Sequence, residues 1–291
     1  MSARRSDSRS ITDRADLHTH TTASDGLLRP GQLVALAAQR GLAAIAITDH
    51  DTLDGVLEIQ ALGEVELLVV PGVELSCSQG GEDVHLLGYG IDPAAPVLGD
   101  LLRERQDERR ARATAIVGRL TELGAAISLE RVTAIAGSGT VGRPHIARAL
   151  VESGHVSTIG EAFDRYLASG RPAYIERPVL TPRRAIPIIH RAGGAAVLAH
   201  PLYSPGYVDF LPLLVEAGLD GIEVVYPDHD GATQRQLAAL AASYGLVGTG
   251  GSDFHADSGR PGRSLGESTV PVGVVEQLEE RAARRHDMGS S

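Results

Sequence analysis

The sequence has a single cysteine, Cys77, and no segment that resembles a membrane span or an export signal. One cysteine excludes an intramolecular disulfide and is typical of a protein from a reducing compartment. No apolar run approaches the roughly 18 residues that a membrane-spanning helix needs. Residues 1–13 are polar and lack the apolar core of a signal peptide. We therefore expect a cytoplasmic protein without membrane contact.

Positive charge is also scarce, because the formal net charge is −10 at pH 7. A surplus of carboxylates argues against broad electrostatic attraction to nucleic acid or to an anionic membrane, so we expect no stable complex with DNA. A local basic pocket remains compatible with this charge. No phosphate-binding P-loop or dinucleotide-binding glycine motif stands between a predicted strand and helix, and no serine nucleophile elbow is present. ATP, NAD and serine-nucleophile chemistry therefore have little support.

Short apolar runs alternate with helical patterns along the chain, as in a parallel α/β sheet or barrel. A length of 291 residues suits one large α/β domain or a barrel with an insertion. The run 84–89 follows a Gly-Gly turn and can pair with the run before it as a hairpin. The predicted strands are 15–20, 43–48, 66–74, 84–89, 195–199, 221–225 and 246–250, and the predicted helices are 30–41, 53–62, 181–192 and 234–244.

Residues 92–172 break this alternation. The segment is rich in Arg, Glu, Leu and Ala at helical spacing and contains no convincing strand. We expect a helical insertion, or cap, that divides the barrel into a first part at 14–91 and a second part at 173–283. Residues 1–13 and 284–291 are expected to be disordered tails.

The segment 16–26 contains two histidines and two acidic residues close together. Side chains at positions i and i+2 of an extended segment point to the same face, so His18 and His20 would present both imidazoles to one point. An exposed histidine-rich loop would explain this pair equally well. The arrangement recurs, however, at the ends of five apolar runs, which finish in His18 and His20, Asp49 and His50, Glu74, His200, and Asp253 and His255.

The carboxyl ends of parallel strands gather on one face of a barrel and form its active site. Counting His85 on the predicted hairpin, six of the eleven histidines would meet there. Histidines with scattered structural roles would not follow strand ends. Imidazoles and carboxylates without a thiolate suit Zn²⁺, Mn²⁺ or Fe²⁺, and with Asp25 there are enough ligands for about three ions. Clustered divalent ions activate water and neutralise charge on a phosphoryl oxygen, which points to hydrolysis of a phosphate ester.

Five motifs together resemble the successive motifs of the PHP (polymerase and histidinol phosphatase) superfamily, in order from about residue 15 to residue 274. The resemblance implies a distorted seven-stranded (β/α) barrel with a trinuclear metal centre. The helical insertion, the motif Gly-Arg-Pro-His-Ile-Ala-Arg at 142–148 and Asp25, where some relatives have histidine, are similar to one branch. That branch contains 3',5'-nucleoside bisphosphate phosphatases and 5'-to-3' exoribonucleases. The motifs are 16–20 (DLHTH), 47–51 (ITDHD), 71–74 (PGVE), 198–201 (LAHP) and 251–255 (GSDFH).

The resemblance also implies which side chains bind the three ions, with Mn²⁺ the expected metal and Zn²⁺ or Fe²⁺ as alternatives. Glu74 would bridge the first two sites. The implied ligands are His18, His20, Glu74 and Asp253 for the first ion, Glu74, His85 and His200 for the second, and Asp25, His50 and His255 for the third. Asp49 is expected to orient a metal-bound imidazole, and Asp51 to cap the helix that follows it.

The substrate pocket is expected in the insertion. Arg143 and His145 lie in a Gly/Pro-flanked turn that opens a helix, where a guanidinium and backbone N–H groups can meet a phosphate. The resemblance implies that Arg112 and Arg143, together with His145 or Tyr174, face the barrel mouth and hold a phosphate that is not cleaved. The neighbouring Arg109 and Arg110 fit a solvated helix face. The remaining histidines are expected to be structural or exposed, at positions 155, 190, 229 and 286.

The expected reaction is hydrolysis of a nucleoside 3',5'-bisphosphate to the monophosphate and phosphate, with 5'-to-3' trimming of short 5'-phosphorylated RNA as a related activity. Metal-activated hydroxide would attack phosphorus in line, and a bound water or a nearby histidine, His200 or His255, would protonate the leaving oxygen. A phosphatase of AMP or of histidinol phosphate is the close alternative. A non-catalytic metal-binding module, such as one attached to a polymerase, and a structural zinc protein belong to other classes. The oligomeric state stays open.

Overall fold

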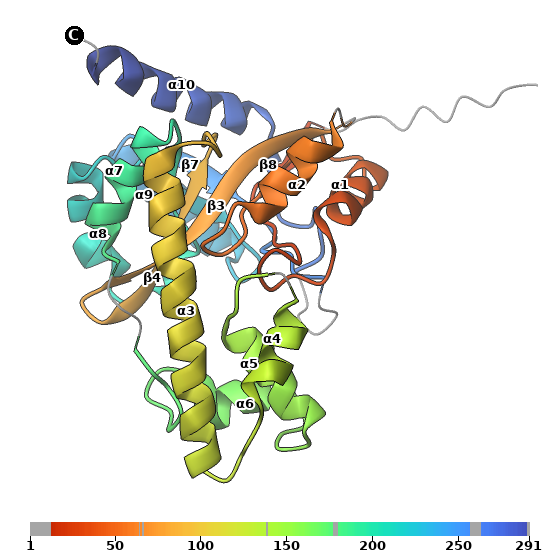
Figure 1. Ribbon diagram of the computed structural model, residues 1–291. Helices are drawn as coiled ribbons and strands as arrows, with labels where there is room; N and C mark the ends of the chain where they lie inside the picture. Colours follow the sequence, from red (N-terminus) through yellow and green to blue (C-terminus); the bar gives the residue numbers. More distant parts are fainter. Residues whose placement is uncertain are drawn as a thin grey trace, which may run out of the picture.

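A computed structural model describes residues 13–289, apart from residues 64, 66, 138, 177–179 and 257–262. Eight strands form one sheet in the order β7-β6-β5-β4-β3-β2-β1-β8 (Figure 1). The sheet curls into a nearly closed barrel, because Leu17 N–H donates to Gly250 O at 3.2 Å and Thr19 forms a parallel bridge with Phe254. The strands are β1 (Arg14–Asp16), β2 (Ala44–Ile47), β3 (Leu68–Gln79), β4 (Glu82–Tyr89), β5 (Ala195–Leu198), β6 (Gly221–Val225), β7 (Val247–Gly250) and β8 (Val270–Pro271).

The expected distorted (β/α) barrel is confirmed, with eight strands in place of seven. Strands β1, β2 and β3 are parallel, as are β5, β6 and β7, whereas β4 runs antiparallel to both of its neighbours. The additional strand, β8, has two residues and pairs antiparallel with β1. The predicted hairpin is the β3–β4 pair, and β3 continues to Gln79 because its end pairs with the start of β4. This antiparallel hairpin is the distortion of the barrel.

The alternation of side chains along the strands separates two apolar regions. In β2, Ala44 and Ala46 face the barrel interior, while Ile45 and Ile47 pack against the surrounding helices. In β2, therefore, small residues face the interior and branched residues face the helices. One close contact requires glycine, since a Cβ atom on Gly251 would lie 2.3 Å from the backbone nitrogen of His18. Gly251 thus allows the end of β7 to approach the end of β1.

Helices cover the outside of the barrel and one of its ends. Helix α8, in the second part of the barrel, was not anticipated. Helix α10 lies across the barrel end in Figure 1 and buries Val274, Val275 and Leu278 against the interior residues. It continues to Gly289, so the disordered tail expected from Arg284 is wrong over most of its length. The helices are α1 (Pro30–Gln39), α2 (Asp54–Leu62), α7 (Pro182–Arg191), α8 (Tyr207–Glu216), α9 (Gly231–Ser243) and α10 (Gly273–Gly289).

The segment expected to form a helical insertion is built on the long helix α3 (Pro96–Glu122). The first half of α3 packs on the barrel through Leu98, Leu101 and Leu102. Its second half, from Ala113 onward, belongs to a separate apolar cluster that ends at Ala173. Figure 1 shows α3 running from the barrel to the smaller helices beyond it. These are α4 (Leu129–Ala136), α5 (Arg143–Glu152), α6 (Ile159–Ala162) and the π-helical turn η1 (Phe163–Leu167).

No helix in the described part of the chain combines the length and the apolar character needed to cross a membrane.

Candidate metal centre

The nine side chains predicted to bind metal lie together at one end of the barrel. Six are buried, and His50, His85 and His255 are partly exposed. They follow the ends of β1, β2, β5 and β7 or lie within the β3–β4 hairpin, so the barrel topology gathers residues that are up to 237 positions apart between His18 and His255. The predicted convergence at the strand ends is therefore observed.

Glu74, on β3, is the centre of this cluster. Its carboxylate is 1% exposed and lies close to five imidazoles. Burial alone would raise the pKa of Glu74, but the imidazoles of His50, His85 and His18 hold that pKa well below its usual range. The distances are 3.2 Å from Oε2 to His18 Nε2, 3.1 Å to His20 Nε2 and 3.2 Å to His50 Nδ1, and from Oε1 2.6 Å to His85 Nδ1 and 3.1 Å to His200 Nε2.

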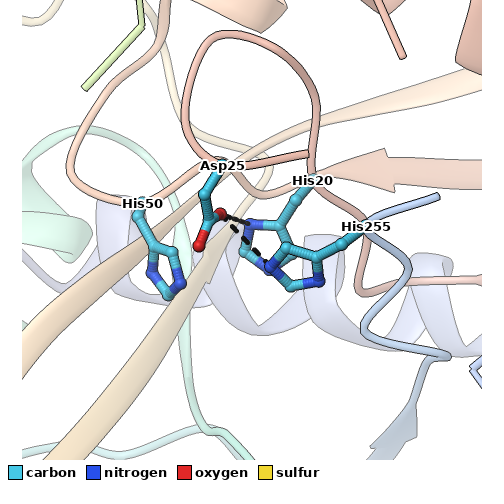
Figure 2. Close-up of side chains that lie close together, drawn as sticks. All are labelled: His20, Asp25, His50 and His255. Atoms are coloured by element: carbon cyan, nitrogen blue, oxygen red, sulfur yellow. Dashed lines mark ion pairs between the residues drawn. The ribbon is translucent and has the colours of Figure 1, made fainter. Parts of the chain in front are cut away.

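A second group forms around Asp25, as Figure 2 shows. Asp25 Oδ1 lies 3.2 Å from His255 Nε2 and 3.9 Å from His20 Nδ1. The rings of His20 and His255 are stacked, with centroids 4.2 Å apart, and His50 lies on the other side of the carboxylate. One ligand atom from each of these four residues lies within 4.8 Å of the others. Asp25, His50 and His255 were the expected third set, and His20 adjoins it.

Asp253, which follows β7, divides its two oxygens between different partners. Oδ1 lies 3.2 Å from His20 Nε2 and 3.5 Å from His18 Nε2. Oδ2 accepts a hydrogen bond from Tyr226 Oη at 2.7 Å and forms an ion pair with Arg263. Because Oδ2 is held by these two groups, Oδ1 is directed at the imidazoles. Neither Tyr226 nor Arg263 was anticipated, since their contacts depend on the tertiary fold.

The donor atoms fit divalent metal ions. Within the described residues, His20 Nε2, Asp25 Oδ1 and His50 Nδ1 are buried and have no hydrogen-bond partner of good geometry. A buried polar atom without a partner costs about 1–3 kcal/mol, and metal coordination would satisfy all three. Imidazole and carboxylate are suitable ligands for Zn²⁺, Mn²⁺ and Fe²⁺. The three groups within coordination reach are His18, His20 and Glu74; His50, Glu74 and His85; and His20, Asp25, His50 and His255.

Glu223, on β6, supports the cluster and was missed from the sequence. Its Oε1 lies 3.0 Å from His18 Nδ1, and its Oε2 accepts the backbone N–H of His200 at 2.7 Å. A carboxylate at Nδ1 fixes the tautomer of a metal-binding histidine and leaves a lone pair on Nε2. The same residue holds His200, whose φ of 24° is unusual for a side chain other than glycine. A glutamate inside the apolar run 221–225 was the available signal.

Asp49 and Asp51 have roles that differ from those expected. Asp49 does not orient an imidazole; it accepts hydrogen bonds from Thr21 N, Thr21 Oγ1 and Ser24 Oγ at 2.8, 2.7 and 2.6 Å, which holds the turn that carries Asp25. Asp51 does not cap α2, which begins after Leu53 without a side-chain cap. Its Oδ1 accepts from Ser76 N at 3.0 Å and its Oδ2 from Arg109 Nε at 2.7 Å.

The nine predicted metal ligands are called the metal cluster below, and two adjoining clefts open at it. The narrow cleft is bordered by His50 and His85 and by three arginines of the insertion, which are Arg109, Arg112 and Arg143. The wide cleft, of about 810 Å³, shares His50, His85 and Arg143 with it and extends past Tyr203, Tyr226 and Arg263. Arg109, expected on a solvated face, instead borders the cleft because Asp51 and Ser76 hold its guanidinium. Arg110 is exposed, as expected.

Of the four predicted substrate-binding residues, two border the narrow cleft and two have other contacts. Arg112 and Arg143 border the narrow cleft, as expected. Tyr174 lies beneath them, its ring centroid 5.3 Å from the Arg112 guanidinium and 5.7 Å from that of Arg143, so it positions the arginines. His145 is 1% exposed, and its Nδ1 accepts the backbone N–H of Gly142 at 3.0 Å. Substrate contact by His145 is therefore wrong, because its ring is used at the start of α5.

The remaining histidines have local partners. His155 Nε2 lies 2.9 Å from Ala126 O, His190 Nε2 lies 3.1 Å from Asp220 Oδ2, and His229 Nδ1 lies 2.9 Å from Val224 O. The side chain of His286 lies outside the described residues.

Comparison with known proteins gives the family. The chain matches the model of the PHP domain over residues 16–168. It belongs to the PHP family. The PHP protein is 38% identical over 268 residues to the 5'-3' exoribonuclease Rnm of Salmonella typhimurium, with 89% of this chain and 90% of the relative covered. It is 36% identical over 282 residues to the 3',5'-nucleoside bisphosphate phosphatase of Chromobacterium violaceum, with 94% and 99% covered.

A third relative has a different named substrate. The phosphoribosyl 1,2-cyclic phosphate 1,2-diphosphodiesterase of Eggerthella lenta is 38% identical over 250 residues, with 84% of this chain and 95% of the relative covered. Among solved structures, a metal-dependent phosphoesterase from Bifidobacterium adolescentis superposes with a TM-score of 0.83 at 32% identity, with 92% and 96% of the two chains covered. The PHP protein is thus a metal-dependent phosphoesterase, a hydrolase that acts on phosphate esters, and the resemblance read from its motifs is confirmed.

Proposed function

We propose that the protein hydrolyses nucleoside 3',5'-bisphosphates to the 5'-monophosphate and inorganic phosphate, and that it trims short 5'-phosphorylated RNA from the 5' end. The observation that supports this substrate is the narrow cleft, where Arg109, Arg112 and Arg143 face the same space as His50 and His85. The phosphate that is hydrolysed must bind at the metal cluster. Three guanidinium groups beside that cluster suit a second phosphate, which a monophosphate substrate lacks.

The named substrates of the relatives support the same reasoning. A nucleoside 3',5'-bisphosphate and a phosphoribosyl 1,2-cyclic phosphate each carry two phosphates, and RNA carries one at every nucleotide. A metal cluster beside a cluster of arginines matches this shared feature. The ribose and the base would distinguish the three substrates from one another.

We propose three divalent ions, with Mn²⁺ as the metal, because the cluster combines imidazoles with three carboxylates. Bound divalent ions would lower the pKa of a coordinated water and neutralise charge on the phosphoryl oxygens. Glu74 offers Oε2 to one group of imidazoles and Oε1 to another, which suits a bridging role. The proposed sets are His18, His20, Glu74 and Asp253; Glu74, His85 and His200; and Asp25, His50 and His255.

The protein's own side chains would bind and orient the substrate. Arg112 and Arg143 would hold the 5'-phosphate, since both guanidinium groups are already positioned against the Tyr174 ring. His200 and His255 were both expected to protonate the leaving oxygen, but both belong to the proposed metal-binding sets, and His200 Nδ1 is buried. Both ring nitrogens of His255 face oxygen atoms, of Asp25 and Asp253. We therefore propose that a bound water, the other expected donor, supplies this proton.

The test is kcat/KM of the Mn²⁺-loaded protein for adenosine 3',5'-bisphosphate, AMP, histidinol phosphate and a short 5'-phosphorylated RNA. We expect a preference for the bisphosphate and the RNA. A preference for AMP or histidinol phosphate would contradict the second-phosphate pocket, and a lack of turnover on all four would favour a binding module.

Substitution of one arginine tests the pocket directly. We expect Arg112→Ala to raise KM for the bisphosphate by about tenfold or more, as the loss of a charged hydrogen bond of about 1.5–3 kcal/mol predicts, and to change KM for AMP less. Arg110→Ala, two residues away on the same helix and with a side chain that is 73% exposed, is the matched control. Equal increases in KM for both substrates would show that Arg112 does not bind the second phosphate.

A further inference from the structure

Aromatic side chains are few in this protein, yet three of them border the wide cleft. The chain has seven tyrosines, three phenylalanines and no tryptophan. Phe163, Tyr203 and Tyr226 border the wide cleft. Tyr226 is 2% exposed and donates a hydrogen bond to Asp253, whereas Tyr203 is 53% exposed. Tyr203 is therefore an aromatic ring that is open to solvent beside the metal cluster.

The ring of Tyr203 is held in place although it is exposed. Its hydroxyl donates to a carboxylate oxygen of Asp228 and lies 3.3 Å from Arg263 Nη2. The ring meets His200 edge to face, with centroids 5.5 Å apart, and meets Tyr226 in the same way at 5.9 Å. An aromatic ring that is fixed at its hydroxyl and its edge loses little conformational freedom when a flat group stacks on it.

Tyr203 and the arginine pocket lie in different parts of the site. Arg109 and Arg112 border the narrow cleft, Tyr203 borders the wide one, and His50 and His85 border both. Arg109 is held by residues that follow β2 and lie on β3, whereas Tyr203 follows β5. The metal ligands His50 and His85 therefore lie between Arg109 and Arg112 in the narrow cleft and Tyr203 in the wide one, and Arg143 borders both clefts. A substrate with its 5'-phosphate on the arginines and its next phosphate at the cluster would continue into the wide cleft.

We propose that Tyr203 is a stacking platform for the nucleotide on the 3' side of the scissile phosphodiester. This inference rests on the proposed function. Water adds to phosphorus, the bond from phosphorus to O3' breaks, and O3' leaves with the first nucleotide and takes up a proton. The phosphate remains on the second nucleotide, whose base lies on Tyr203. A nucleoside bisphosphate has no second nucleotide, so Tyr203 sets the preference for RNA over the bisphosphate.

The test compares two substrates in the same preparation, the dinucleotide pApA and adenosine 3',5'-bisphosphate. We expect Tyr203→Ala to lower the ratio of kcat/KM for pApA to kcat/KM for the bisphosphate by about tenfold or more, as the loss of one base-stacking contact predicts. Tyr203→Phe keeps the ring and should keep most of the ratio. Tyr244→Ala, a half-exposed tyrosine at the end of α9, is the matched control and should leave both rates unchanged. An unchanged ratio in Tyr203→Ala would overturn the inference.

A binding measurement separates this inference from the proposed function. The probe is a 5'-phosphorylated diribonucleotide with a 3'-fluorescein and a methylene group in place of the bridging O3', followed by anisotropy with the Mn²⁺-loaded protein, so that no turnover occurs. We expect the Kd for Tyr203→Ala to be about tenfold higher than for the unsubstituted protein. If the unsubstituted protein hydrolyses neither substrate, the proposed function fails, and the binding result alone decides on Tyr203. Equal Kd values, or no binding by the unsubstituted protein, would overturn its role as a platform.

Discussion

Replacement of Glu223 by glutamine tests whether this buried carboxylate orients the metal ligands His18 and His200. The two carboxylate oxygens of Glu223 accept from His18 Nδ1 and from the backbone N–H of His200. A glutamine side chain has a single acceptor oxygen, and its NH₂ group would face the other donor. One buried N–H is therefore left without an acceptor, which costs about 1–3 kcal/mol. Because residues that orient metal ligands typically contribute 10–100-fold to metal affinity, we expect Glu223→Gln to bind Mn²⁺ more weakly by about that factor.

The measurement is Mn²⁺ affinity by competition with a chelating indicator, together with urea unfolding of the metal-free protein. Glu276→Gln, on the exposed face of α10, removes the same charge far from the cluster and is the control. We expect Glu223→Gln to lose both affinity and stability, and Glu276→Gln to lose neither. If Glu223→Gln bound Mn²⁺ as tightly as the control, the carboxylate would not be orienting His18, and the reasoning from the hydrogen bonds would be refuted.

Two further predictions concern stability. Burial lowers the pKa of His145 to about 4, so between pH 6.5 and pH 4 the unfolded chain binds a proton at this residue that the folded protein does not. Between pH 7 and pH 5 the free energy of unfolding should therefore fall by about 2 kcal/mol more in the unsubstituted protein than in His145→Gln, in which glutamine keeps an acceptor near the start of α5. Equal decreases for the two proteins in urea unfolding would contradict this. Removal of divalent ions with EDTA should lower the melting temperature, and Mn²⁺ at a hundred times its Kd should restore about 2.7 kcal/mol in calorimetry. A melting temperature independent of EDTA and Mn²⁺ would argue against occupancy of the cluster.

The metal cluster could be read from the sequence because its ligands follow a simple rule of topology. His18, His50 and His200 each come just after a short apolar run, and the parallel strands of a barrel bring such positions together. Glu74 and His85 lie within the β3–β4 hairpin, which the Gly-Gly turn indicated. Local patterns and strand direction were therefore sufficient for a parallel α/β sheet or barrel and for the proximity of these residues, whereas the distorted barrel was implied by the resemblance to the PHP superfamily.

The supporting side chains could not be read in the same way. Arg263 reaches Asp253 only because of the tertiary path of the chain, and the contact of Arg109 with Asp51 joins the insertion to the barrel. The motif around His145 opens a helix and therefore predicted substrate contact, but the Nδ1 atom of His145 accepts a hydrogen bond from the backbone N–H of Gly142. The partners in these three contacts are 10, 58 and 3 positions apart, and hydrogen bonds of this kind produce no periodic pattern in the sequence.

The close approach of β1 and β7 at Gly251 bears on how the protein becomes active during synthesis. Asp16 and Ser252, whose backbone and side chain both donate to the Asp16 carboxylate, are 236 positions apart. His18 and His20 are synthesised before Asp253 and His255, and 233 positions separate His20 from Asp253. A nascent chain therefore holds part of the ligand set without a completed centre, and contacts of such long range form late in folding. A chain that ends before Asp253 lacks two of the nine proposed ligands, and we therefore expect it to lack phosphoesterase activity.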